Sequence, residues 1–235
     1  MQYKVLCMLN YFLNRQARCM NLLNGCMLVP CEKSCGCAPF KLILRLMQEI
    51  EPSFQWESIY NAAHDKKSPF YGRCYSQTEY EHDIYGYYIH PLWDEIDSET
   101  LYCKILYSDY QMQFSIIEMF GEWNDTLHND IMLFKRQVID HLLAAGIKYF
   151  ILLGENVFNF HGSFEDDYYA EWFEQVEDGW IAALQFAPFV EEEWKKYHVD
   201  YYINFGGNLN VPQWRTLKPE VLFAGVQHIL ARRLN

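Results

Sequence analysis

The second half of the chain shows a regular pattern of hydrophobic and polar positions. Two apolar, β-prone runs, residues 101–107 and 114–120, flank the polar stretch 108–111 and therefore predict an antiparallel hairpin. Apolar residues then recur at helical spacing over residues 127–145. This spacing predicts a helix that Gly146 ends.

The pattern continues as an alternation of strands and helices. The nearly continuous apolar run 148–153 predicts a central strand that is buried on both faces of a sheet. Residues 179–186 and 199–205 predict two more strands. Helices are predicted between and after these strands, over residues 163–176, 188–197 and 219–234. The order β-β-α-β-α-β-α-β-α predicts an α/β fold in which a mixed sheet of about five strands carries crossover helices.

The first 95 residues show no comparable pattern. Residues 41–50 suit a short helix that ends before Pro52. Residues 52–95 are rich in Tyr, Gly, Ser and His, which favours irregular structure or short strands. The sequence therefore predicts an irregular, partly helical N-terminal region, residues 1–95, that packs on or extends from an α/β domain formed by residues 96–235.

Two local motifs lie within residues 112–206. The turn 121–124, Gly-Glu-Trp-Asn, precedes a predicted helix whose N-cap is Asn124 or Asp125. An apolar strand later leads to the loop 160–163, Phe-His-Gly-Ser, at the start of another helix. With the order of the elements, these motifs resemble the STAS domain, the fold of bacterial anti-sigma-factor antagonists. In that family the turn reads like Gly-Glu-Leu-Asp and the loop like Phe-x-Asp-Ser.

The resemblance implies a role for Ser163, which lies at the position of the family's phosphorylatable switch serine. Gly162 stands where the family has aspartate. Glu165, Asp166 and Asp167 follow at the predicted helix start, and their negative charge would repel a dianionic phosphoserine. Ser163 is therefore either a switch residue or a plain helix N-cap.

The net charge of −12 is unevenly distributed. Residues 112–206 carry 17 acidic and 5 basic side chains, whereas residues 1–50 carry 6 basic and 2 acidic ones. This balance argues against a nucleic-acid partner, because contacts to phosphate groups need a basic face. It favours a protein partner with a basic face, because a like-charged partner would be repelled. The sequence does not indicate an oligomeric state.

The acidic, aromatic-rich region indicates a non-enzymatic module that regulates or binds another protein. Its predicted interaction surface combines the loop 154–163 with the acidic helix 164–177. Aromatic side chains beside carboxylates form such a surface where they are exposed, and form core where they are buried. The candidate partner-binding or switch residues are Glu155, His161, Ser163, Asp166, Asp167 and Trp172.

The alternative function is that of a metal-dependent hydrolase. Carboxylates near the carboxyl ends of strands could hold Mg²⁺ or Mn²⁺ and activate a water molecule. The candidates are Glu118, Glu122, Asp125, Glu155, Asp166 and Asp167. The same carboxylates could instead form exposed helix faces and stabilise a first helical turn. A Ser-His-acid hydrolase is not indicated, because Ser163 lies in Phe-His-Gly-Ser-Phe and not in a Gly-x-Ser-x-Gly motif.

The beginning of the chain is rich in cysteine. Four thiols, those of Cys26, Cys31, Cys35 and Cys37, are close enough in sequence to hold a structural zinc ion. Their spacing is not the paired Cys-x-x-Cys pattern, so reduced thiols are the alternative. No other cofactor is expected. The sequence contains no run of 18 apolar residues and no secretory signal, so we expect a cytoplasmic protein without disulfides or a membrane span.

Overall fold

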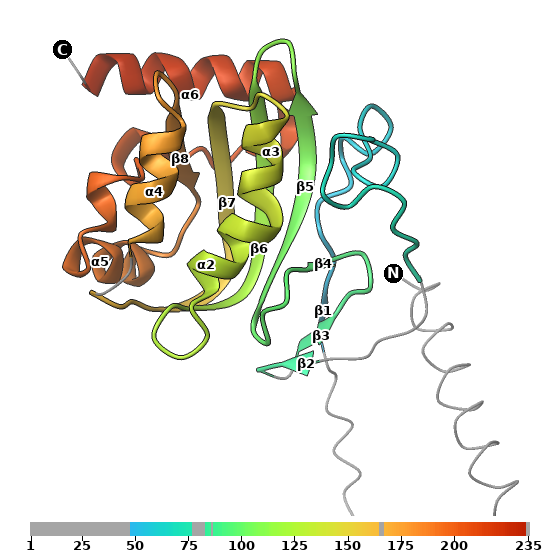
Figure 1. The fold of residues 1–235 in the computed structure, drawn as a ribbon, viewed down its shortest axis with the longest axis horizontal. Coiled ribbons are helices and arrows are strands. Elements are labelled where there is room, and N and C mark those ends of the chain that lie inside the picture. The colour runs from blue at the N-terminus through green and yellow to red at the C-terminus, as the bar shows by residue number, and fades with distance from the viewer. Residues whose placement is uncertain (1–47, 77–82, 86, 165–166, 234–235) are drawn as a thin grey trace, which may run out of the picture. The chain divides into compact units, whose positions relative to one another are not determined.

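A computed structural model describes residues 48–76, 83–85, 87–164 and 167–233 (Figure 1). The four N-terminal cysteines proposed as zinc ligands lie outside the described residues, as do Glu165 and Asp166. The predicted helix 41–50 lies mostly outside them too, but residues 48–50 form a strand and not a helix. That strand is held by parallel pairing with Tyr87–Ile89, which overrides the local helical preference.

A five-stranded mixed sheet forms the centre of the fold, in the order β4-β5-β6-β7-β8 (Figure 1). β5 and β6 pair antiparallel, which confirms the predicted hairpin, while β6, β7 and β8 pair parallel. The predicted α/β fold with a mixed sheet is therefore confirmed. The strands are β4 (Asp94–Glu95), β5 (Leu101–Asp109), β6 (Phe114–Asn124), β7 (Tyr149–His161) and β8 (Trp180–Leu184).

Alternate side chains of the central strand β6 enter two separate cores. Ile117 and Met119 belong to one apolar cluster, and Phe114 and Ile116 belong to the other, because successive side chains of a strand point to opposite faces. One core is covered by α2 (Asp130–Phe134), η1 (Lys135–Ile139), α3 (Asp140–Ala144), α4 (Tyr168–Gln175) and α5 (Pro188–Lys196). The other is covered by α6 (Pro219–Arg233) and by the short turns η3 (Gly207–Leu209) and η4 (Trp214–Thr216).

A second, three-stranded sheet precedes the central one, in the order β1-β3-β2. Its strands are β1 (Gln48–Ile50), β2 (Asp83–Ile84) and β3 (Tyr87–Ile89). Ile89 of this sheet shares a third apolar cluster with Trp93, Tyr102 and Phe120. The described part of residues 52–95 thus contains short strands and turns, in agreement with the local sequence pattern.

The predicted loop 154–163 is wrong over most of its length, because β7 continues to His161. The predicted turn at Gly121 is wrong for the same reason, since β6 continues to Asn124 and pairs with β7 up to the pair Asn124–His161. Gly121 permits this continuation, because its φ is +110° and a Cβ atom there would lie 2.0 Å from the Thr100 carbonyl oxygen. The register of β6 against β7 shifts on either side of it.

The helix after β6 exists but begins later than predicted. Its first residue is Asp130, and Asn129 precedes it in a left-handed conformation. Asp125 still binds the first turn of the helix, because its Oδ1 atom accepts a hydrogen bond of 2.9 Å from the backbone amide of Ile131. Leu127, which the helical pattern includes, is 76% exposed.

The predicted strand 199–205 is also wrong. Its first residues form a 3₁₀ turn, η2 (Val199–Tyr201), and only Asn204 pairs with β8, through a single bridge to Ala182. Val199 and Ile203 are buried while Tyr201 between them is 66% exposed, so burial does not alternate as it would along a strand. The helices over residues 188–197 and 219–234 are confirmed as α5 and α6.

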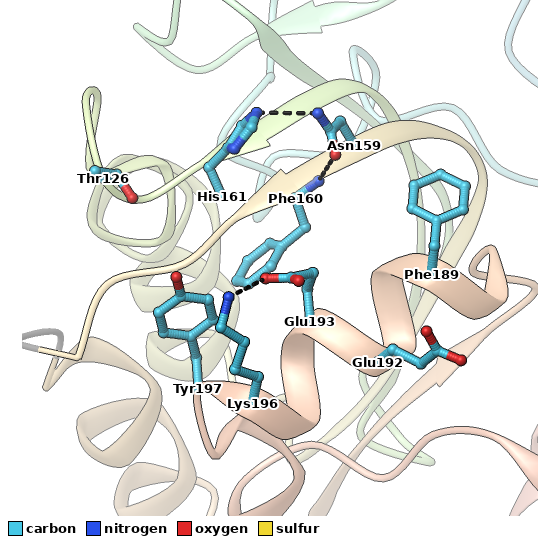
Figure 2. Close-up of a pocket in the computed structure, with 9 residues that line it drawn as sticks. All are labelled: Thr126, Asn159, Phe160, His161, Phe189, Glu192, Glu193, Lys196 and Tyr197. Atoms are coloured by element: carbon cyan, nitrogen blue, oxygen red, sulfur yellow. Dashed lines mark hydrogen bonds and ion pairs between the residues drawn. The ribbon is translucent and has the colours of Figure 1, made fainter.

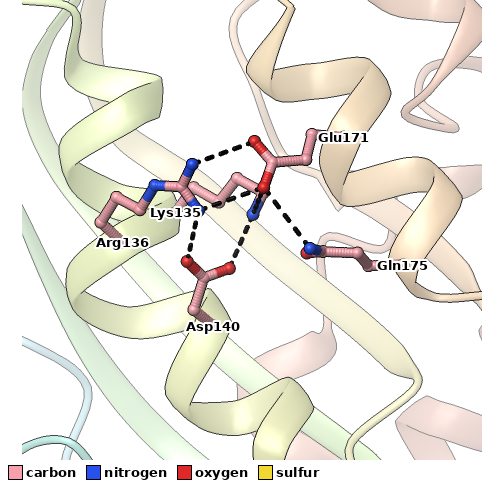
Figure 3. Close-up of polar contacts among 5 residues, drawn as sticks. All are labelled: Lys135, Arg136, Asp140, Glu171 and Gln175. Carbon is pink, nitrogen blue, oxygen red and sulfur yellow. Dashed lines mark hydrogen bonds and ion pairs between the residues drawn. The ribbon is translucent and has the colours of Figure 1, made fainter.

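A buried lysine joins two helical segments on one face of the sheet (Figure 3). The Lys135 ammonium is fully buried and lies 2.6 Å from Asp140 Oδ1 and 2.8 Å from Glu171 Oε1. Arg136 binds the same two carboxylates from the exposed side. Gln175 completes the network through Glu171. These contacts fix η1 and α3 against α4.

Replacing Lys135 by methionine should lower the free energy of unfolding by about 2 kcal/mol, because two charge-assisted hydrogen bonds are lost while the apolar stem is kept. The surface variant Lys148→Met is the matched control. Its ion pair with Glu177, at 3.5 Å, is exposed and should contribute less than about 0.5 kcal/mol. Denaturant unfolding of both variants and the wild type measures the difference, and equal losses would contradict a special role for the buried lysine.

Candidate functional site

Two of the predicted site residues lie on β7 and have separate partners. Glu155 is exposed and pairs with Arg215 at 2.8 Å. His161 ends the strand. Its Nε2 atom lies 3.2 Å from Glu122 Oε1 and 3.0 Å from the side-chain Nδ2 atom of Asn159. Glu155 and His161 therefore do not share one polar site.

Ser163 does not have the predicted N-cap role. It is half-buried and lies two residues after the end of β7, whereas α4 begins only at Tyr168, with Asp167 in the N-cap position. The Asp167 side chain makes no capping hydrogen bond and is exposed.

Trp172 belongs to the core and not to the surface of α4. Its side chain is fully buried. Its ring lies edge-on to Phe134 and Phe150, with ring centres 5.9 Å and 5.3 Å away. The aromatic side chain of α4 that does reach the surface is its neighbour, Phe173.

The carboxylates of the hydrolase hypothesis are held in different places. Asp125 is buried and accepts hydrogen bonds from the Trp123 indole, the Ile131 amide and the Tyr169 hydroxyl. Glu122 faces His161 and the Tyr85 hydroxyl. Within residues 48–76, 83–85, 87–164 and 167–233, no group of three or more His, Cys, Asp and Glu side chains is arranged to hold a metal ion.

Glu118 is a buried acid in the middle of β6. Its carboxylate accepts hydrogen bonds from the Ser53 amide at 2.7 Å, from Asn156 Nδ2 at 3.2 Å and from Arg215 Nη2 at 3.2 Å. Burial raises the pKa of Glu118 from 4.5 to about 7, against the opposing effect of these donors. No local sequence pattern links Arg215 to Glu118, because the two residues are 97 positions apart along the chain.

A continuous row of aromatic side chains, here termed the aromatic strip, crosses the surface beside α4 and α5. It starts at Phe164, whose ring centre is 4.6 Å from that of Tyr197 and 6.4 Å from that of His198. His198 stacks on Tyr201 at 5.1 Å. Tyr201, Tyr202 and Phe173 continue the row at 6.4 Å and 6.0 Å. The strip consists of Phe164, Tyr197, His198, Tyr201, Tyr202 and Phe173.

The aromatic strip is exposed and has acidic neighbours. Phe164 is 69% exposed and Tyr201 is 66% exposed. Acidic side chains on the same segments are also exposed, and no ion pair to them is present among the described residues. These are Asp167 and Glu174 at the two ends of α4 and Asp200 in η2. The strip thus joins apolar area to negative charge.

A cavity of about 470 Å³ adjoins the aromatic strip at Tyr197 (Figure 2). It lies between the end of β7 and one side of α5. Figure 2 shows that Asn159 and His161 border it from the strand, while Glu193, Lys196 and Tyr197 border it from the helix. The complete lining is Thr126, Asn159, Phe160, His161, Phe189, Glu192, Glu193, Lys196 and Tyr197.

Most residues of the aromatic strip were missed by sequence reasoning. Tyr201 and Tyr202 lie in the segment 199–205, for which a strand is predicted. Val199 and Ile203 are four residues apart, which fits one face of a strand as well as a helical turn, so the local sequence carries no signal for exposed tyrosines. No helix in the described part of the chain is long and apolar enough to cross a membrane.

Replacing Glu118 by glutamine should change how stability depends on pH. The folded wild type holds the proton of Glu118 up to a higher pH than the unfolded chain, so its stability falls as the pH rises from about 4.5 towards 7. Relative to Glu118→Gln, the wild type should lose about 2 kcal/mol of unfolding free energy over this window. Denaturant unfolding across the pH range measures this difference.

Glu155→Gln is the control, because Glu155 shares Arg215 but is exposed. Its effect on the pH dependence should be small, because the Glu155 charge is only a minor cause of the raised pKa of Glu118. A parallel pH dependence of the wild type and Glu118→Gln would contradict an elevated pKa at Glu118.

Comparisons with known proteins find likenesses in structure alone. No protein-family model and no curated protein matches the sequence. The structure of the anti-sigma factor antagonist SpoIIAA in its unphosphorylated form matches 45% of this chain and 89% of its own length, at 11% identity and a TM-score of 0.32. That of the Bacillus cell fate determinant SpoIIAA in the phosphorylated form matches 45% and 92%, at 10% identity and a TM-score of 0.31. Likenesses of this size assign no function to the chain.

Proposed function

We propose that the chain is a non-enzymatic protein-interaction module that binds its partner through the aromatic strip. The observation that carries the proposal is the strip itself. Its rings follow one another within 6.4 Å from Phe164 to Phe173, and they come from three different segments of the fold. Single exposed aromatic residues are common on protein surfaces, whereas contiguous ones are typical of binding sites.

The rings of the aromatic strip supply the apolar part of such an interface. Full burial of one large apolar side chain contributes roughly 1.5–3 kcal/mol. Aromatic residues also lose little conformational freedom on binding, because they have only two side-chain torsions. Phe164 and Tyr201 have the most exposed rings of the strip and therefore the most area to bury.

The carboxylates around the strip indicate the charge of the partner. Asp167, Glu174 and Asp200 are exposed, and no cation neutralises them in the described part of the chain. A partner with a basic face would approach faster and bind in a defined orientation. Raising the ionic strength should therefore weaken the complex.

The regulatory part of the proposal concerns Ser163. It lies directly beside Phe164 in sequence, and its sequence context resembles that of the switch serine of STAS domains. A phosphate group there would add about two negative charges at the edge of the aromatic strip. This added negative charge would strengthen the attraction between the aromatic strip and a basic partner.

The double variant Phe164→Ser, Tyr201→Ser should lose at least about tenfold in capture of partner proteins, because two large apolar side chains are removed from the interface. The immobilised full-length chain is incubated with cell extract, and captured proteins are quantified by mass spectrometry. The proteins of interest are those whose capture also falls with increasing salt.

The matched control is Phe54→Ser, because Phe54 is 67% exposed but does not belong to the aromatic strip. It should capture the same proteins as the wild type. Equal capture by the double variant and the wild type, with both folded by circular dichroism, would contradict the proposed interface.

Ser163→Glu should raise capture of the same proteins about threefold, because one added charge beside the strip contributes up to about 1 kcal/mol towards a basic partner. Ser163→Ala should behave as the wild type does. Gln213→Glu, which adds the same charge just before η4 and outside the strip, should have no effect. Equal capture by wild type and Ser163→Glu would refute the switch role and leave the aromatic strip as the proposed interface.

A further inference from the structure

The cavity beside the aromatic strip combines carboxylates with aromatic rings. Glu192 and Glu193 are neighbours on α5, and both border the cavity. The rings of Phe160, Phe189 and Tyr197 form its apolar part. Its volume of about 470 Å³ lies in the range of protein ligand sites. The lining therefore suits a group that is positively charged and has apolar faces.

Within the described part of the chain, an arginine lies beside an aromatic ring and two carboxylates at three places, Arg73, Arg136 and Arg215. Arg136 lies 5.5 Å over the Tyr168 ring and binds Glu171 at 3.1 Å and Asp140 at 2.9 Å. The chain thus holds a guanidinium group between two carboxylates and an aromatic face (Figure 3 shows the carboxylates).

Another of these places lies at η4. Arg215 lies 4.4 Å over the Trp214 ring and binds Glu155 at 2.8 Å and Glu118 at 3.2 Å. Both examples use the planar guanidinium group, which stacks on a ring while its edge donates hydrogen bonds to carboxylates.

In the cavity, a lysine occupies the corresponding place. Lys196 Nζ lies 3.2 Å from Glu193 Oε2 and 5.0 Å from the centre of the Tyr197 ring (Figure 2). The Lys196 side chain is 57% exposed, so its ion pair with Glu193 lies at the surface. A better-fitting cation could displace it at little cost, because an exposed ion pair contributes little to stability.

We propose that this cavity receives an arginine side chain of the partner protein, which displaces Lys196. The proposal rests on the proposed function, because Tyr197 belongs both to the aromatic strip and to the cavity lining. A partner bound along the strip would pass the cavity and could insert one side chain. Arginine fits better than lysine, because a planar guanidinium group can stack on the ring faces of the cavity while its edge donates hydrogen bonds to the carboxylates.

The test is a titration of the full-length chain with N-acetyl-arginine amide, followed by nuclear magnetic resonance. The citrulline analogue, which has the same shape without the charge, and the lysine analogue are measured alongside. The arginine compound should shift signals of Tyr197, His161 and Phe189, and both analogues should bind more weakly by about threefold or more. Free arginine is included to separate a protein-borne side chain from a small-molecule ligand.

Two neighbouring substitutions should act in opposite directions. Glu193→Gln should weaken binding of the arginine compound about threefold, because a carboxylate of the site is removed. Lys196→Met should strengthen binding about threefold, because the competing cation is removed. The control Lys195→Met, on α5 but outside the cavity lining, should leave binding unchanged.

Equal binding of the citrulline analogue, tighter binding of free arginine, or a loss of binding in Lys196→Met would each overturn the proposal. These outcomes are separate from the capture experiments. If the arginine compound fails to bind while Phe164→Ser, Tyr201→Ser still loses its partners, the arginine site is wrong and the aromatic strip stands. If that double variant keeps its partners, the interface itself is wrong.

Discussion

The parallel pairing of β6 with β7 is the constraint on which the rest of the structure depends. It runs from the pair Phe114–Tyr149 to the pair Asn124–His161, past two shifts in register. Beyond the last pair, the His161 carbonyl accepts hydrogen bonds from the backbone amides of residues 125 and 126. Because the strand extends this far, His161 borders the cavity. The segment that leads to α4 begins directly after it. The cavity borders the last pairs of this ladder at Asn159, Phe160 and His161, and Phe164 of the aromatic strip follows β7 in the chain.

Two buried charged groups, one on β6 and one on a helix packed against the sheet, bind neighbouring segments of the chain. Glu118 on β6 binds the Ser53 amide, and Lys135 in η1 binds Glu171 of α4. Taking a charge out of water costs several kcal/mol unless its partners are well placed. Such groups therefore favour the one arrangement of segments in which those partners are present. The positions of α4 and of the chain before β2 are fixed in this way as well as by apolar packing.

The sequence predicts those elements whose signal is local. The hairpin of β5 and β6, the Pro188 helix start and the helix ended by Gly146 each depend on nearby residues, and each is present. The continuation of β7 through Glu155 and Asn159 is different, because these polar residues suit a loop. They form a strand because β6 supplies backbone partners, which no local pattern reveals. The same limit applies to the aromatic strip, whose rings come from three segments that only the fold brings together.

The rings of the aromatic strip are not needed to complete the core. On α4, Tyr169, Trp172 and Val176 follow helical spacing and fill the buried face, and Phe173 lies outside this face. The core beneath α4 is already closed by four aromatic rings around Trp123. Tyr197 and Tyr202 pack partly against this core, whereas Phe164, Phe173 and Tyr201 leave much of their rings in water. Their apolar surface can be removed from water only by a further contact, and the exposed carboxylates around it favour a positively charged one.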